Sequence, residues 1–145
     1  WGYEAETPSN SKFVDEHEWQ GTRDIAAFLT VPKAIAYQQE QDWVKVRSAC
    51  HQLVVEAWYR IHDVTKQTPL HSDPEVWFAQ MTVSSLPVNT DALSFKQKLY
   101  DEFRIEVPII DWHGNKLIRT SVQGYNSKRD IDRLIDTLKK MLDTV

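Results

Sequence analysis

The longest periodic run in this sequence extends from about Asp42 to Val64. Apolar residues recur in it at intervals of three and four positions, and this spacing places them on one face of an α-helix. We therefore expect one long helix that buries a single side. The residues of that side are Val46, Cys50, Leu53, Ala57 and Ile61, with Val54 and Trp58 widening the stripe.

The sequence after this run predicts the order strand, helix, strand, strand, helix. Strand-forming side chains, a hairpin turn and a capping-box pattern are the signals used. They indicate an α+β fold in which a small, mainly antiparallel sheet carries helices on one face. The expected elements are a strand at 76–83, a helix carrying Leu93 to Phe103, strands at 105–112 and 116–122 joined by a turn at 113–115, and a helix behind 127–130.

The first 41 residues show a weaker pattern. Residues 1–20 are polar and predict irregular structure. A helical pattern then begins at Asp24 and continues to about Gln41. Pro32 either breaks this helix or stands at the first position of a second one, with Thr30 near its cap.

Composition excludes several classes of partner. The formal net charge is −4 and no basic block occurs, which argues against binding of nucleic acid. The single cysteine, Cys50, allows no internal disulfide and fits a reducing compartment. Without a long apolar run we expect no membrane partner, and a cytoplasmic location. A chain that opens on Trp1 and Gly2 is expected to be an excised piece or a processed product.

A candidate anion site lies at Gly21-Thr22, just before the helix expected at Asp24. A hydroxyl and backbone N–H groups at the positive end of a helix suit a phosphate. The same residues are also an ordinary helix start, which local evidence alone favours.

Arg119 lies in the middle of the last expected strand. Its planar guanidinium can hold a carboxylate through two hydrogen bonds. A strand arginine also commonly points to solvent, and both interpretations stay open. The following Tyr125-Asn126 predicts turn and packing chemistry rather than catalysis.

The sequence offers no catalytic residue and no metal site. His51 and His62 share a helix face but lie about 16 Å apart, too far for one ion. Cys50 falls on the apolar face of the long helix and is expected in the core. No lysine is placed in an apolar pocket of the kind that a Schiff base requires.

The order of these features resembles the C-terminal portion of the class V aminotransferase family, in its isopenicillin N epimerase-like branch. Nearly the whole chain is involved. The motifs are Trp19-x-Gly21-Thr22-Arg23-Asp24, Val31-Pro32, Trp43-x-x-Val46-Arg47 and Ile118-Arg119-x-Ser121-x-x-x-Tyr125-Asn126.

The resemblance implies roles for four residues. Thr22, with Gly21, would contact the phosphate of pyridoxal phosphate held by the other subunit of a homodimer. Arg119 would bind the α-carboxylate of an amino-acid substrate, and Arg23 would be a residue of the substrate pocket or a packing residue. The family's Schiff-base lysine lies upstream and has no match in this sequence.

The resemblance also implies a division of the chain. Residues 1–41 would be an incomplete tail of the large cofactor domain, and residues 42–145 a bridging helix with the small domain. The parent enzyme would be an amino-acid epimerase, transaminase or lyase. The fragment alone would be inert and would hold no cofactor. The alternative is a stand-alone α+β module that binds a ligand or a protein without catalysis.

Overall fold

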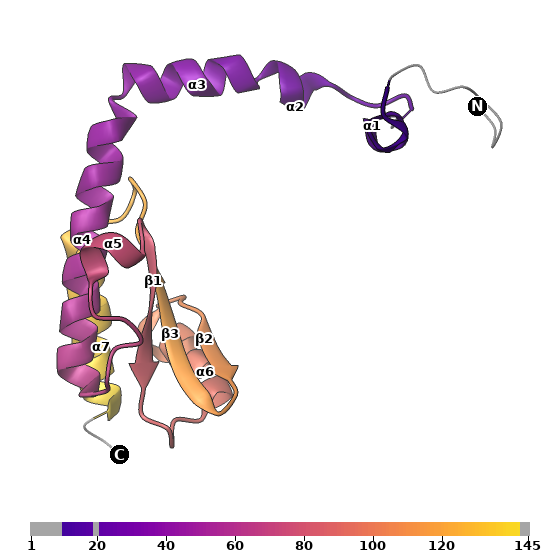
Figure 1. Ribbon diagram of the computed structural model, residues 1–145. Helices are drawn as coiled ribbons and strands as arrows, with labels where there is room; N and C mark the ends of the chain where they lie inside the picture. The colour runs from indigo at the N-terminus through magenta and orange to yellow at the C-terminus, as the bar shows by residue number, and fades with distance from the viewer. Residues whose placement is uncertain (1–9, 19–20, 143–145) are drawn as a thin grey trace. The chain divides into compact units, whose positions relative to one another are not determined.

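The computed structural model describes residues 10–18 and 21–142 (Figure 1). The predictions that involve Trp1, Gly2 and Trp19 lie outside these residues. The chain divides into two units, residues 1–41 and 42–145, and each is described by itself. Within the described part of the chain, no helix is both long enough and apolar enough to cross a membrane.

The described residues of the first unit, 10–18 and 21–41, form the helices α1 (Lys12–Glu18), α2 (Ala26–Leu29) and α3 (Val31–Glu40). The prediction of irregular structure over residues 1–20 is wrong for residues 12–18, which form α1. The start of α2 corrects the prediction of a helix from Asp24, because the Asp24 carboxylate instead accepts the Ala26 N–H at 2.8 Å. None of the described residues in this unit is buried, so they form no core of their own.

Pro32 stands at the start of α3 rather than breaking a continuous helix. The missing proline N–H costs nothing there, because the first N–H groups of a helix have no partner within it. Thr30 is the residue before α3, but its side chain makes no cap hydrogen bond. Its hydroxyl donates backwards to the Ala27 carbonyl at 2.7 Å.

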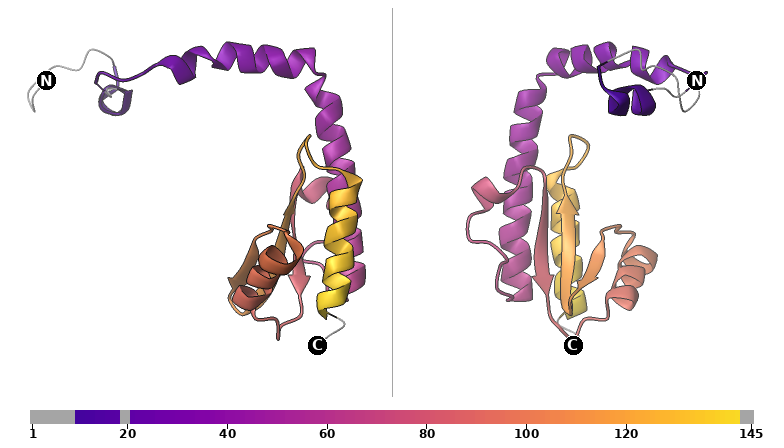
Figure 2. Two further views of the ribbon diagram at one scale, coloured as in Figure 1. Left: turned by 180° about the vertical axis from the view of Figure 1, so that it is seen from behind. Right: turned by 45° about the vertical axis from the view of Figure 1, so that its right-hand side comes forward.

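The second unit is an α+β fold, as expected. Its sheet has the order β1-β3-β2 and is antiparallel throughout. Figures 1 and 2 show α4 and α7 side by side on one face of this sheet. The elements are α4 (Trp43–Thr65), α5 (Pro74–Trp77), β1 (Met81–Leu86), α6 (Ala92–Phe103), β2 (Ile109–Trp112), β3 (Asn115–Ser121) and α7 (Lys128–Leu142).

The core lies between the sheet and these helices. The α4 stripe predicted from spacing and the apolar face of α7 each supply four residues to its buried cluster, and the sheet with the residue after β3 supplies the rest. Phe95 of α6 packs against the same core, so the expectation of helices on one face is confirmed. The buried residues of this core cluster are Cys50, Val54, Ala57, Ile61, Leu86, Ile118, Val122, Ile131, Leu134, Ile135 and Leu138.

Two carboxylates fix the starts of the later helices. The Asp91 carboxylate accepts the Ser94 N–H at 2.8 Å at the start of α6. The Asp130 carboxylate accepts the Ser127 N–H at 2.7 Å, which is the reverse half of the predicted capping box. These bonds favour the ionised acid and hold the pKa of both aspartates below its ordinary value.

Ionic contacts join α4 to α7 at the rim of the core. Arg60 lies 2.7 Å from Asp132 and 3.0 Å from Glu56, and Lys128 lies 2.8 Å from the same Glu56. The bond from Lys128, with the nearby charges, lowers the pKa of Glu56 despite the opposing effect of desolvation. These pairs are partly exposed, so each contributes about 1 kcal/mol or less.

Two predicted strands begin too early. Residues 76–83 were expected as one strand, but Asp73 accepts the Glu75 N–H at 3.1 Å and starts the short helix α5. The second strand was expected over residues 105–112. Its pairing with β3 begins only at Ile109, because the preceding Pro108 has no N–H to donate.

Two leucines test the importance of this core. Leu138 in α7 has no exposed surface, whereas Leu93 in α6 is 76% exposed. We expect Leu138→Ala to lower the free energy of unfolding by about 2–5 kcal/mol and Leu93→Ala by less than about 0.5–1 kcal/mol. Urea unfolding followed by circular dichroism measures both. Equal losses would contradict the assigned core.

Candidate functional site

Arg119 lies in the central strand β3, opposite Val83 of β1. Its backbone N–H donates to the Pro108 carbonyl at 3.0 Å, so both neighbouring chain segments fix its position. Successive side chains of a strand point to opposite faces. Because Ile118 belongs to the core, Arg119 lies on the sheet face turned away from α4 and α7.

The guanidinium of Arg119 carries an unmet hydrogen-bond donor. Its Nε atom is buried and has no hydrogen-bond partner among the described residues. A buried N–H without an acceptor is unfavourable by about 1–3 kcal/mol, and more for a charged group. The simple interpretation of a fully solvated side chain therefore does not hold for Nε. The arrangement is chemically suited to an incoming carboxylate.

The Gly21-Thr22 turn is open. Gly21 has a φ of +65°, a conformation that glycine adopts without strain, and an added Cβ there would contact nothing. The positive φ, and not a lack of room for a side chain, therefore explains why a glycine stands at this position. Thr22 is exposed beside it. The turn leaves room for an anion on its outer side.

The helix that follows this turn contributes less than the sequence suggested. Helix α2 has four residues, too few for a large dipole. The Asp24 carboxylate already accepts one N–H at its start. Arg23 brings the opposite charge, with its guanidinium carbon 4.8 Å from the centre of the Phe28 ring. A phosphate here would rely on the turn and on Arg23 more than on the helix.

The predicted site residues fall into different units of the chain. Gly21, Thr22 and Arg23 belong to the first unit and Arg119 to the second. Their roles as cofactor and substrate ligands stay predictions.

The described residues contain no group of three or more potential metal ligands. The two histidines of α4 face separate partners. His51 lies 2.7 Å from the Ala79 carbonyl and 3.2 Å from Glu75. His62 Nδ1 lies 2.8 Å from the Trp58 carbonyl. Cys50 is buried in the core.

A cluster of aromatic and imidazole rings beside α4 was not predicted. His71 stacks between Trp58 and Trp77, with ring centres 5.3 and 5.8 Å away and near-parallel planes. His62 packs 4.5 Å from the same Trp58 ring. Trp58 and His62 are neighbours on one face of α4, and the segment after α4 brings His71 and the α5 residue Trp77 to them.

The cluster disfavours charge on His62. Burial lowers the pKa of the His62 imidazole, the nearby His71 lowers it further, and the hydrogen bond to the Trp58 carbonyl partly opposes both. With Nδ1 donating to that carbonyl, a neutral ring leaves Nε2 as an acceptor. Nε2 is buried without a partner among the described residues.

The loop after β3 differs in one respect from its prediction. The turn chemistry is present, since the Asn126 side-chain oxygen accepts the Gln123 N–H at 2.9 Å. Gln80 further anchors the loop by donating to the Val122 carbonyl at 3.0 Å. The packing prediction for Tyr125 is wrong, because this side chain is 85% exposed.

No family model matches this sequence. Isopenicillin N epimerase of Amycolatopsis lactamdurans is 31% identical over 156 aligned positions, covering 97% of this chain and 38% of that protein. Isopenicillin N epimerase of Streptomyces clavuligerus is 31% identical, covering 83% of this chain and 30% of that protein. The chain thus spans well under half the length of these relatives.

Among solved structures, alanine–glyoxylate aminotransferase from Nostoc sp. superposes with a TM-score of 0.52 and 25% identity, over 64% of this chain and 25% of that one. The second unit therefore has the fold of an aminotransferase-like small domain. The chain belongs to the pyridoxal-phosphate-dependent class V aminotransferase-like family and matches the C-terminal part of its relatives.

The burial of His62 predicts a pH effect on stability. Its folded pKa lies below the ordinary value of 6.5, so the unfolded chain binds a proton that the folded chain resists. We expect the free energy of unfolding to fall as the pH is lowered from about 7 to about 5. Urea unfolding at several pH values measures this slope.

Two variants attribute that slope. His62→Gln should flatten it, because the titrating group is gone. The exposed hairpin residue His113 serves as the control, and His113→Asn should leave the slope unchanged, since asparagine tolerates its positive φ of 49°. If His62→Gln has the same dependence of unfolding free energy on pH as the parent protein, the effect does not arise from His62.

Proposed function

We propose that this chain forms the C-terminal part of a pyridoxal-phosphate-dependent enzyme that acts on an amino acid. Its relatives favour epimerisation first, with transamination or lyase chemistry as the other members of the same class. When bound, the cofactor supplies an electron sink for the carbon that reacts. The residues of this chain would position substrate and cofactor rather than perform the chemistry.

The observation that carries this proposal is the unpaired guanidinium of Arg119. Its Nε is buried and lacks an acceptor, on the sheet face that the core leaves free. A substrate α-carboxylate would accept from the terminal nitrogens of this planar group, and from Nε once the side chain moves to expose that atom. That pairing would remove the unmet donor and orient the amino acid by two bonds.

The Gly21-Thr22 turn would supply one side of the phosphate site. Its exposed hydroxyl and open backbone can donate to phosphate oxygens. Arg23 would add positive charge nearby. The carboxylate of Asp24 limits the strength of this site, so we assign it a supporting contact rather than the whole site.

The remaining groups would come from elsewhere in a longer protein. We propose that an upstream part supplies the Schiff-base lysine and that the phosphate contact reaches the other subunit of a cytoplasmic homodimer. Residues 1–41 would then pack on the large domain. This fits their exposed Phe28 and Leu29, which have no buried neighbours among the described residues of that unit. The isolated chain is expected to be inactive.

Arg119→Lys in the intact enzyme tests the carboxylate contact. A lysine keeps the charge but loses the paired geometry, so we expect KM for the amino acid to rise about tenfold, with a smaller change in kcat. Arg129→Lys on the exposed start of α7 is the matched control and should leave KM unchanged. Steady-state kinetics provide both values. An unchanged KM in Arg119→Lys would remove the proposed role.

Thr22→Ala tests the phosphate contact. Loss of one hydroxyl that donates to a charged acceptor should weaken cofactor affinity about tenfold or more. Thr22→Ser keeps the hydroxyl and is the matched control. Titration of the apo-enzyme with pyridoxal phosphate, followed by visible absorbance, measures the affinity. Equal affinities in the alanine and serine variants would show that the hydroxyl makes no contact.

A further inference from the structure

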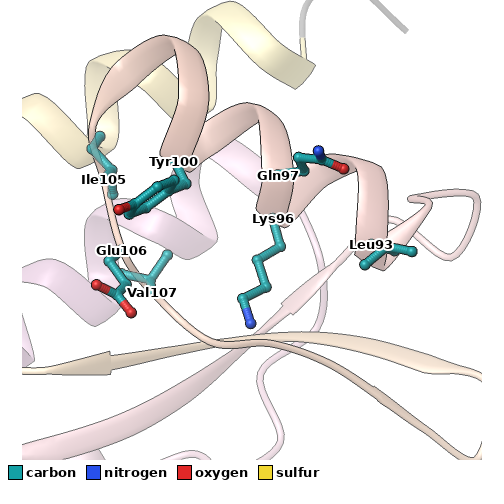
Figure 3. Close-up of a pocket in the computed structure, with 7 residues that line it drawn as sticks. All are labelled: Leu93, Lys96, Gln97, Tyr100, Ile105, Glu106 and Val107. Carbon is teal, nitrogen blue, oxygen red and sulfur yellow. The ribbon is translucent and has the colours of Figure 1, made fainter.

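A cavity lies between α6 and the chain segment that follows it. Arg104 ends the helix with a φ of 54°, and the Ile105 N–H donates back to the Leu99 carbonyl at 3.0 Å. The chain therefore reverses and runs beside the helix it has just left. Residues 105–107 and α6 line a half-open groove with a volume of about 270 Å³ (Figure 3).

The walls of this cavity are largely apolar. Leu93 and the ring of Tyr100 contribute from the helix, and Ile105 and Val107 from the returning segment. This volume is slightly below the range of pockets that hold drug-sized ligands, so it suits a molecule of metabolite size.

Two opposite charges face this space from different walls. Lys96 extends from α6 toward the returning segment, and Glu106 lies on that segment (Figure 3). Neither side chain forms an ion pair of 4.0 Å or less with any residue that the structure describes.

Elsewhere in this unit, opposite charges on different elements pair directly. Arg60 meets Asp132 at 2.7 Å, Lys128 meets Glu56 at 2.8 Å, and Lys116 pairs with Asp111. Lys96 and Glu106 differ in that they line the same cavity without forming an ion pair within 4.0 Å. A ligand that carries both charges would connect them.

We propose that this cavity binds a small zwitterion, namely a free α-amino acid with an apolar side chain. Its carboxylate pairs with Lys96, its ammonium group pairs with Glu106, and its side chain packs on Leu93, Ile105 and Val107. Gln97 supplies a further amide at the rim. Neither Arg119 nor the Gly21-Thr22 turn lines the cavity, so this site is additional to the proposed substrate site and needs no cofactor.

The pairing of charges defines the ligand class. A simple anion would gain from Lys96 but be repelled by Glu106, and a simple cation would meet the reverse. A wholly apolar molecule would leave both Lys96 and Glu106 without an oppositely charged partner. Both charged residues are exposed, so solvent weakens each contact and we expect a dissociation constant in the millimolar range.

The test is a titration of the full 145-residue chain, labelled with ¹⁵N, with L-leucine as the probe. We expect saturable amide shifts confined to α6 and residues 105–107. N-acetyl-leucine, which lacks the positive charge, and leucinamide, which lacks the negative charge, should each bind about fivefold more weakly. Absence of saturable shifts, shifts centred elsewhere, or equal binding of all three compounds would overturn the proposal.

Matched variants separate the two contacts. Lys96→Gln and Glu106→Gln should each weaken leucine binding about fivefold. Lys98→Gln and Glu102→Gln, exposed residues of α6 that do not line the cavity, should leave it unchanged.

Charge reversal gives a decisive comparison. Lys96→Glu and Glu106→Lys should each abolish leucine binding when made singly, and the double reversal should restore it for D-leucine, because this enantiomer exchanges the positions of the two charged groups while its side chain stays on the same apolar wall. The dispersion of the amide spectrum checks that each variant is folded. A double variant that is folded and does not bind D-leucine, or single variants that bind as the parent does, would contradict the proposed pairing.

Discussion

Burial of the apolar face of α4 against α7 and the sheet is the interaction on which the rest of the second unit depends. Val54, Ala57 and Ile61 are completely buried along that face, and Leu138 meets them from α7. Each large side chain buried in this way stabilises the fold by about 1.5–3 kcal/mol. The partly exposed ion pairs around Arg60 add less than one such residue. These ion pairs therefore contribute more to the alignment of α4 and α7 than to the free energy of their packing.

One-sided burial has a direct consequence for the proposed site. Because α4, α6 and α7 share a single core, the alternation along β3 divides its residues between a covered face and a free face. Ile118 anchors the strand from the covered side. Arg119 then lies on the free side, at a register fixed by β1 on one edge and by the Pro108 carbonyl on the other. The packing that stabilises the unit thus also positions the guanidinium.

Sequence periodicity located the elements that carry a long apolar stripe. It found α4 and α7, whose stripes are supplied by many residues, and the turn between β2 and β3. It failed for α5, where an Asp73-Pro74 cap overrides the strand preference of the residues that follow. It also missed α1, which is short, polar and without buried residues. Local capping and proline effects act through one or two residues and leave little periodic signal.

The candidate site likewise has features that the sequence pointed to and features that only the structure shows. Motif order singled out Arg119 and the Gly21-Thr22 turn as candidates, because each combines a residue type with a local conformation. The buried Nε of Arg119 and the stacking of His71 between two indoles depend on contacts between distant parts of the chain. No spacing rule contains that information. The exposure of Tyr125 likewise follows from how Gln80 and Asn126 anchor its loop.

The two halves of the proposed substrate and cofactor site also differ in what makes them rigid. Sheet register and a buried core hold Arg119, whereas among the described residues only a local turn and the Asp24 cap order Gly21 and Thr22. A phosphate contact requires fixed donors, since ordering a mobile turn on binding would consume much of the free energy gained. The exposed Phe28, Leu29 and Ile35 would supply that rigidity once another surface covers them. This is the physical reason why we propose that the cofactor binds to a homodimer of the longer protein, and not to residues 1–145 alone.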